Sequence, residues 1–230
     1  MPVFRVLGFP VRVKLGFLVF LASVVVWNPE VGWQFAIAIT LFSLIHELGH
    51  AVAARRLGAE PEIALDFLAG STRYTPPRPI SPVERALVAV TGPLVEIASG
   101  LFVLGIMRVN PFDIPRVFDS TLAGVVWIAG PAFGLLNLLP VLPLDGGHVL
   151  AGALESVWPK LGQSIAAGFS AAVTGAFAVV ALLEHRVRWL APFALLLVVL
   201  QIWPLVPRRF SVLKRTKTRS LETENEVSVG

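Results

Sequence analysis

Long apolar stretches, separated by short breaks rich in proline, glycine or charged residues, dominate this chain. Most of them approach the roughly 20 residues that an α-helix needs to cross a bilayer. We predict about six transmembrane helices, over residues 15–27, 33–54, 86–107, 121–139, 161–183 and 189–206. The pattern therefore predicts an all-α polytopic membrane protein.

One segment between the second and third predicted helices does not fit a membrane span. Residues 57–83 contain five prolines and two glycines, and short strand-like runs over 63–68 and 71–74 flank Gly70. Such runs around a glycine are typical of a hairpin. We expect a short β-hairpin or re-entrant segment here.

Composition supports a membrane protein over a soluble protein with an unusually apolar core. Hydrophobic residues make up 55% of the chain and charged residues 15%, whereas a soluble domain carries about 25% charged residues. The net charge of +4 does not indicate nucleic-acid binding, because basic residues beside spans are mostly topology signals. The first apolar run has no small-residue cleavage site after it, so we interpret it as a retained span rather than a signal peptide.

The distribution of basic residues predicts the orientation. With a cytoplasmic N-terminus, 15 of the 19 Lys and Arg residues fall in cytoplasmic segments and four in outer segments. We therefore expect a multi-pass protein of the cell membrane with both termini in the cytoplasm. Residues 1–207 would form the membrane core, and residues 208–230, which change from basic to acidic, a disordered cytoplasmic tail.

The second predicted helix carries a metal-binding pattern, His46-Glu47-Leu48-Gly49-His50. On a helix, positions i and i+4 share a face, so both imidazoles can reach one ion. Glu47 stands beside them as a general base for hydrolysis. Ionisable side chains this far into a span are costly and usually functional. The alternative is a cluster at a helix end whose side chains reach water.

A catalytic zinc site needs a third protein ligand. The chain has no cysteine, so this ligand must be His, Asp or Glu. The available side chains are Glu96, Asp145, His148, Glu155 and Glu184. Asp145 is favoured because it lies in a proline- and glycine-broken apolar segment, and such backbone at membrane depth lines a cavity or is buried in protein. The predicted topology also brings it to the same membrane side as the histidines.

These two motifs resemble those of the site-2 proteases, intramembrane zinc metalloproteases that pair H-E-x-x-H with N-x-x-P-x-x-P-x-D-G. The second motif here is Asn137-Leu138-Leu139-Pro140-Val141-Leu142-Pro143-Leu144-Asp145-Gly146. The resemblance covers roughly residues 33–155 and implies that His46, His50 and Asp145 bind zinc while Glu47 acts as the base. It further implies that Asn137 and Pro140 bind substrate, and that the hairpin at Gly70 corresponds to the family's strand segment near the active site.

The chain departs from that family at Glu96, where relatives usually have asparagine. A buried carboxylate there would pair with an arginine, tune the site or stay protonated, and the sequence leaves these three roles open. His148 is a weaker ligand candidate than Asp145, and His185 falls in a predicted outer loop.

The expected function is therefore hydrolysis of a peptide bond in or near the transmembrane helix of another membrane protein, within the lipid bilayer. The resemblance implies substrates such as anti-sigma factors, membrane-tethered regulators or signal-peptide remnants. The rival interpretations are a membrane metal-ion transporter and a catalytically inactive scaffold. The oligomeric state stays undetermined.

Overall fold

The structure is a computed structural model that describes residues 3–66 and 70–202. Its helices are α1 (Leu15–Trp27), α2 (Gly32–Arg56), α3 (Pro82–Ile106), α4 (Ile114–Asp119), α5 (Thr121–Trp127), η1 (Ile128–Ala132), α6 (Phe133–Asn137), α7 (Asp145–Val157), α8 (Gly162–Leu183), η2 (His185–Leu190) and α9 (Ala191–Ile202). The strands are β1 (Val3–Val6), β2 (Phe9–Val13), β3 (Glu62–Leu65) and β4 (Gly70–Arg73). Two compact units, Met1–Thr174 and Gly175–Gly230, divide the chain.

Three helices of the described residues, α2, α3 and α8, are long and apolar enough to cross a membrane. Two of the remaining predicted spans correspond to shorter apolar helices, α1 and the continuous run α5–η1–α6. Helix α9 covers residues 191–202 of the predicted run over 189–206, and residues 203–206 lie outside the described residues. Many apolar side chains on these helices face outward; Phe102 and Ile106 of α3, for example, are 70% and 67% exposed. Outward apolar surface of this kind suits a lipid environment. The protein is thus membrane-embedded and mostly helical, while the number of complete spans remains a prediction.

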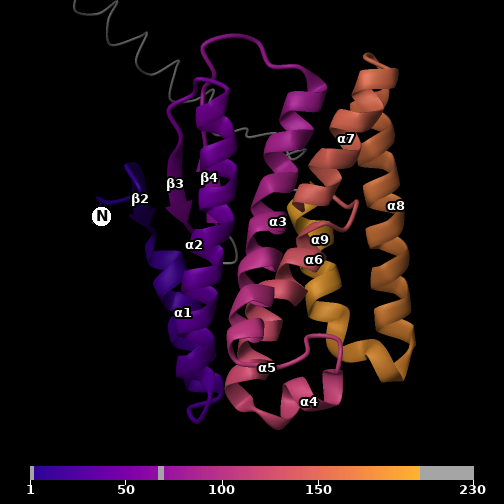
Figure 1. Cartoon of the computed structure of the whole chain (residues 1–230). Coiled ribbons are helices and arrows are strands. Elements are labelled where there is room, and N and C mark those ends of the chain that lie inside the picture. Colours follow the sequence, from indigo (N-terminus) through magenta and orange to yellow (C-terminus); the bar gives the residue numbers. More distant parts are fainter. Residues whose placement is uncertain (1–2, 67–69, 203–230) are drawn as a thin grey trace, which may run out of the picture. The chain divides into compact units, whose positions relative to one another are not determined.

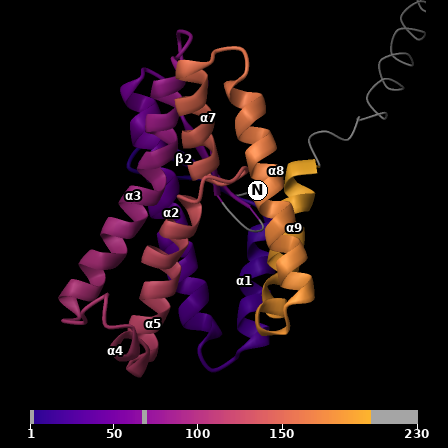
Figure 2. The same ribbon diagram turned by 90° about the vertical axis from the view of Figure 1, so that its right-hand side faces the viewer.

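Helices α2 and α3 lie side by side and form the centre of the first unit (Figures 1 and 2). Glycines permit this close approach, because a β-carbon at Gly49 would lie 2.8 Å from the Thr91 carbonyl oxygen. An apolar core joins the first half of α2 and the last turns of α3 to α5 and η1. It includes Phe42, Leu104 and Val125. The π-helical turn η1 contains Pro131, which packs against Gly100 of α3.

A four-stranded sheet of order β1-β2-β3-β4 packs beside α1 and α2. The β1–β2 hairpin turns at Leu7 and Gly8, both with positive φ, as a two-residue hairpin turn requires. Strands β2 and β3 are parallel and connected through α1 and α2, and β3 and β4 are antiparallel. The sheet is larger than expected, because residues 3–13, for which no strand is predicted from the sequence, form two strands.

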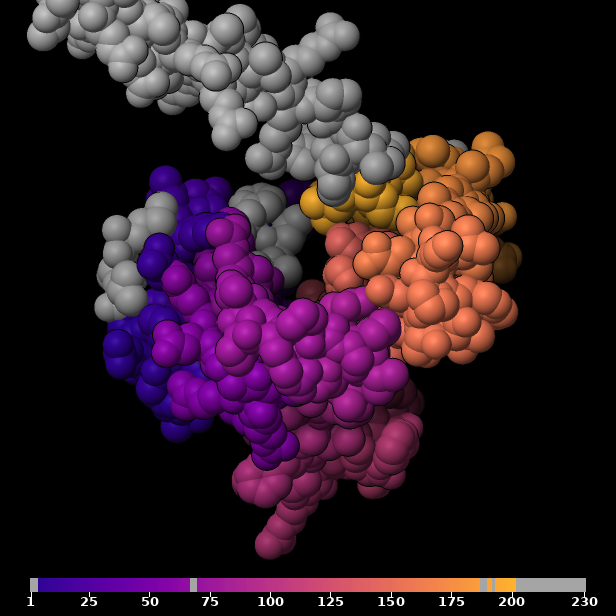
Figure 3. All heavy atoms as spheres, turned by 90° about the horizontal axis from the view of Figure 1, so that it is seen from above, coloured from indigo at the N-terminus to yellow at the C-terminus, as the bar shows by residue number. Residues whose placement is uncertain are grey.

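The sheet lies alongside the half of α2 from which the chain leaves this helix (Figure 1). Seen from above, the indigo N-terminal segments and the purple segments that follow α2 lie next to one another (Figure 3). Phe9, Val11, Ile63 and Leu65 are fully or almost fully buried between the sheet and the helices. Strand β4 is the edge strand on the side of this sheet that contacts α2 near Glu47.

The second unit is described by itself. Small residues form its core cluster, in which Ala178 and Ala181 of α8 pack with Ala191 and Ala194 of α9. The expected tail over residues 208–230 and part of the expected first hairpin strand, residues 67–68, lie outside the described residues.

Candidate metal centre

Helix α2 presents His46 and His50 on one face, one turn apart, as their i, i+4 spacing predicts. Both side chains are buried, with 7% and 8% of their surface exposed. Their Nε2 atoms lie 3.0 Å apart, so the two rings converge on one point.

Helix α3 supplies a hydrogen-bond acceptor for the other nitrogen of each ring. The Nδ1 atom of His50 lies 2.8 Å from the carbonyl oxygen of Val88, and Nδ1 of His46 lies 2.7 Å from Oε2 of Glu96. A carbonyl oxygen and a carboxylate accept hydrogen bonds, so each Nδ1 is assigned as the donor. Each Nε2 of a neutral ring then keeps its lone pair for a metal.

Asp145, the first residue of α7, completes the group. Its Oδ2 atom lies 3.0 Å from Nε2 of His46 and 3.4 Å from Nε2 of His50. The three ligand atoms lie within 4.8 Å of one another. Three lone-pair donors that face one point, two imidazoles and a carboxylate, fit a zinc ion with one position left open.

Glycines and a loop bring Asp145 to the histidines. A β-carbon at Gly146 or Gly147 would collide with the backbone of residues 138–142. Because glycine has no β-carbon, the chain can fold tightly before α7. The amide of Leu142 donates to Ser170 Oγ of α8, which ties this loop to a neighbouring helix. Asp145 also occupies the first turn of α7, where the helix dipole favours a negative charge.

Helix α7 in turn packs closely on α3. A β-carbon at Gly152 would lie 2.6 Å from the carbonyl oxygen of Pro82, so this crossing requires a small residue. Arg85 of α3 forms an ion pair with Glu155 of α7 at 2.6 Å. Helix α3 therefore supports all three ligand candidates, because it contacts both histidines directly and carries the helix that begins with Asp145.

The carboxylate of Glu47 is buried beside the metal group and contacts strand β4. Only 3% of Glu47 is exposed. The hydroxyl of Thr72 lies 2.7 Å from Glu47 Oε2 and 3.0 Å from its carbonyl oxygen. Gly70 lies two residues before Thr72 and therefore on the same face of β4. A β-carbon at Gly70 would collide with the side chain of Glu47.

The other predicted site residues are placed differently. Asn137 ends α6 and is half-buried, and Pro140 is exposed in the loop before α7; their contacts with a substrate stay predictions. Gly70 touches the expected base, and any role in substrate binding also stays a prediction. His148 is exposed and does not belong to the metal-ligand group.

Glu96 is 4% exposed, and its partner among the described residues is His46 rather than an arginine. Of the three roles that the sequence leaves open, tuning the site is the one that this contact with His46 supports. The remaining candidates for a third ligand lie elsewhere: Glu155 pairs with Arg85, and Glu184 is exposed.

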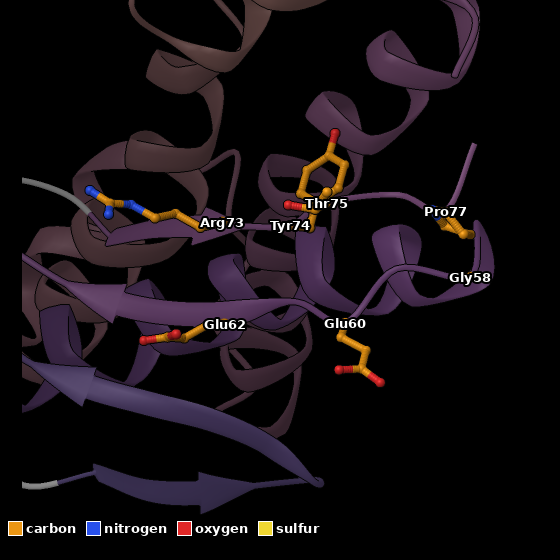
Figure 4. Close-up of a pocket in the computed structure, with 7 residues that line it drawn as sticks. All are labelled: Gly58, Glu60, Glu62, Arg73, Tyr74, Thr75 and Pro77. Carbon is orange, nitrogen blue, oxygen red and sulfur yellow. The ribbon is translucent and has the colours of Figure 1, made fainter. Parts of the chain in front are cut away.

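A shallow pocket of about 580 Å³ opens where β3 begins and β4 ends, and none of the metal-ligand residues lines it. Figure 4 shows its lining residues: Gly58, Glu60, Glu62, Arg73, Tyr74, Thr75 and Pro77. Burial raises the pKa of the Tyr74 hydroxyl above its usual value, and the nearby charge of Arg85 opposes this rise. The pocket lacks the histidines and the buried carboxylates that hydrolytic chemistry needs.

Sequence reasoning missed Thr72 and the carbonyl of Val88 as parts of this centre. A threonine in a short strand carries no chemical signature of its own, and a backbone acceptor carries none at all. The spacing on α3 offered a partial signal, since residues 88, 92 and 96 share one helix face. Their relation to the histidines depends on how α2 and α3 pack.

Comparison with known proteins points to metalloproteases. A model described as Peptidase family M50 matches residues 114–181, a stretch that contains Asp145 but not the two histidines. Zinc metalloprotease MJ0392 of Methanocaldococcus jannaschii is 25% identical over 165 residues, which is 69% of this chain and 46% of that protein. Rip3 of Mycobacterium tuberculosis, described as a candidate zinc metalloprotease, is 30% identical over 195 residues, or 76% of this chain and 48% of that protein.

The chain thus spans about half the length of these curated relatives. Among solved structures, the site-2 protease from Methanocaldococcus jannaschii superposes with a TM-score of 0.58 at 22% identity, over 86% of this chain and 91% of that chain. This likeness shows a shared fold. The chain is therefore similar in sequence to peptidase family M50 and to zinc metalloproteases, and it shares the fold of a site-2 protease.

Proposed function

We propose that the protein is an intramembrane zinc metalloendopeptidase that hydrolyses a peptide bond in or near the transmembrane segment of another membrane protein. The observation that carries this proposal is the convergence of His46, His50 and Asp145 beside the buried carboxylate of Glu47. A group of metal ligands with an adjacent carboxylate is the arrangement that zinc-dependent hydrolysis uses.

The roles of the residues follow from their positions. Zinc held by the three ligands would polarise the scissile carbonyl and lower the pKa of water. Glu47 then takes the proton from the attacking water and delivers it to the leaving amine. Thr72 holds one carboxylate oxygen of Glu47, which leaves the other oxygen of this carboxylate available for proton transfer.

The substrate would bind as an extended strand. A helix hides its carbonyl groups in internal hydrogen bonds, so the cleaved segment must unwind locally. Strand β4 is an edge strand of the sheet and touches Glu47, so a peptide paired with that edge would lie close to the base. In this arrangement Gly70 contributes through its backbone, while Asn137 at the end of α6 and Pro140 in the loop before α7 bind the substrate.

The proposed setting is the cell membrane, with six spans and both termini in the cytoplasm. The division of basic residues supports this orientation. Exposed tryptophans near helix ends, Trp27, Trp33 and Trp158, suit the membrane–water interfaces. Reporter fusions after residue 230 test the orientation: a reporter that is active only outside the cell would overturn the six-span arrangement.

Cleavage of a single-span membrane protein in proteoliposomes tests the activity. The parent protein should cleave the substrate within or beside its apolar segment, as mass spectrometry of the products would show. Glu47→Gln, which keeps the side-chain size but cannot act as a base, should lose about 10²- to 10⁴-fold in rate. Equal cleavage by parent and variant would refute the proposed mechanism.

The same vesicles distinguish the rival functions. A metal transporter would move zinc across the vesicle membrane without proteolysis, and a scaffold would do neither. Release of trapped zinc by the parent protein together with no cleavage would favour transport.

A further inference from the structure

Glu96 is a carboxylate buried in the middle of an apolar helix, where burial of a charge is costly unless it is paired. Its side chain is 4% exposed, and its Oε2 atom lies 2.7 Å from Nδ1 of His46. Both residues lie within long apolar helices, α3 and α2. A carboxylate kept in such a place needs a function.

One face of α3 provides a hydrogen-bond acceptor for each of the two histidines. Val88, Gly92 and Glu96 are spaced four residues apart and share that face. The Val88 carbonyl accepts from His50, and a β-carbon at Gly92 would collide with the His50 ring. His46 lies one turn earlier on α2 and meets the side chain of Glu96 instead of a backbone carbonyl.

We infer that Glu96 is a positioning residue for the metal centre: it accepts a hydrogen bond from Nδ1 of His46 and so holds this ring with Nε2 toward the zinc ion. The inference rests on the zinc ligands proposed above. Metal-binding histidines generally donate their second nitrogen to an acceptor of this kind, which fixes the tautomer and raises the basicity of the ligand atom.

Positioning the His46 ring can be distinguished from simply packing α3 against α2. A leucine at position 96 would fill similar space but would leave the Nδ1 donor of His46 buried without its acceptor, so the metal-free fold should lose some stability. Zinc affinity should fall by about 10- to 100-fold when the acceptor is lost. A residue that only packs would lose no zinc affinity when a side chain of similar size replaces it.

The test uses the full chain in detergent and four proteins: the parent, Glu96→Leu, Glu96→Gln and Ser99→Ala. Glutamine keeps an acceptor oxygen at nearly the same place. Ser99 lies on the same helix and donates to the Glu96 carbonyl at 2.8 Å, so its alanine variant is a matched control that leaves the His46 contact intact. Competition with a zinc chelator gives the affinity, and thermal unfolding of the metal-free proteins gives the stability.

We expect Glu96→Leu to lose about 10- to 100-fold in zinc affinity while its metal-free form stays folded. Glu96→Gln should recover most of this loss, and Ser99→Ala should match the parent. Parent-like zinc affinity in Glu96→Leu would overturn the inference while leaving the three ligands in place. A parent protein that binds no zinc would overturn the ligand set itself, and with it the role of Glu96.

Discussion

The hydroxyl of Thr72 on strand β4 lies 2.7 Å from Oε2 of Glu47 on helix α2, so an edge strand of the sheet directly contacts the carboxylate next to the metal group. The same hydroxyl lies 3.0 Å from the Glu47 carbonyl oxygen. In register with β3, Thr72 stands opposite the buried Ile63, on the face of the sheet that meets α2. A substrate bound at this edge would therefore be aligned with the base through one side chain.

Loss of the Thr72 hydroxyl should slow catalysis without loss of metal. Thr72→Val keeps the shape of the side chain but cannot donate, and a hydrogen bond to a charged group contributes about 1.5–3 kcal/mol. We expect kcat to fall by at least about tenfold, with zinc content unchanged. Thr72→Ser retains the hydroxyl and should restore most of the rate. If the valine variant cleaves as fast as the serine variant, Thr72 does not position Glu47.

A methyl group at Gly70 should displace the base. The β-carbon of Gly70→Ala would collide with the Glu47 side chain, so the carboxylate must move. Cleavage should drop by about 10²-fold or more, the range for loss of a general base, while zinc remains bound. Gly105→Ala is the matched control, because a β-carbon there meets no atom within 4 Å. Cleavage and zinc content are measured on both, and comparable activity in the two variants would count against this account of Gly70.

Substitution of Gly92 by alanine should lower zinc affinity rather than displace the base. A β-carbon there would collide with the ring of His50, and the backbone of α2 around Gly49 is too close to α3 to yield easily. Gly92→Ala should therefore weaken zinc binding, by about the 10- to 100-fold range known for disturbed metal support. Chelator competition measures this loss. Parent-like zinc affinity would show that the ring has room to shift.

Much of this architecture was accessible from the sequence because hydrophobic runs and the H-E-x-x-H spacing report local structure. The predicted run over residues 15–27 is helix α1, and the run over 33–54 lies within α2. Asp145 was selected from its broken backbone, and it lies against both histidines. These features depend on short-range periodicity and on the cost of exposed backbone in a membrane.

The parts that could not be predicted depend on tertiary packing. Strands β1 and β2 are short and contain Arg5, Arg12 and a proline, so their sequence alone does not indicate strands. Their pairing becomes favourable only when β3 lies beside β2, across two intervening helices. The partner of Glu96 was likewise undetermined, because the contact joins residues 50 positions apart in the chain.

The zinc content of two variants of helix α7 tests the central claim most directly. Asp145 and His148 lie three residues apart on that helix, yet Asp145 faces the histidines and His148 is exposed. The parent and His148→Ala should each bind about one zinc ion per chain, and Asp145→Ala should lose most of it, since catalytic zinc needs three protein ligands. Retention of zinc by Asp145→Ala, with loss in His148→Ala, would contradict the proposed metal centre.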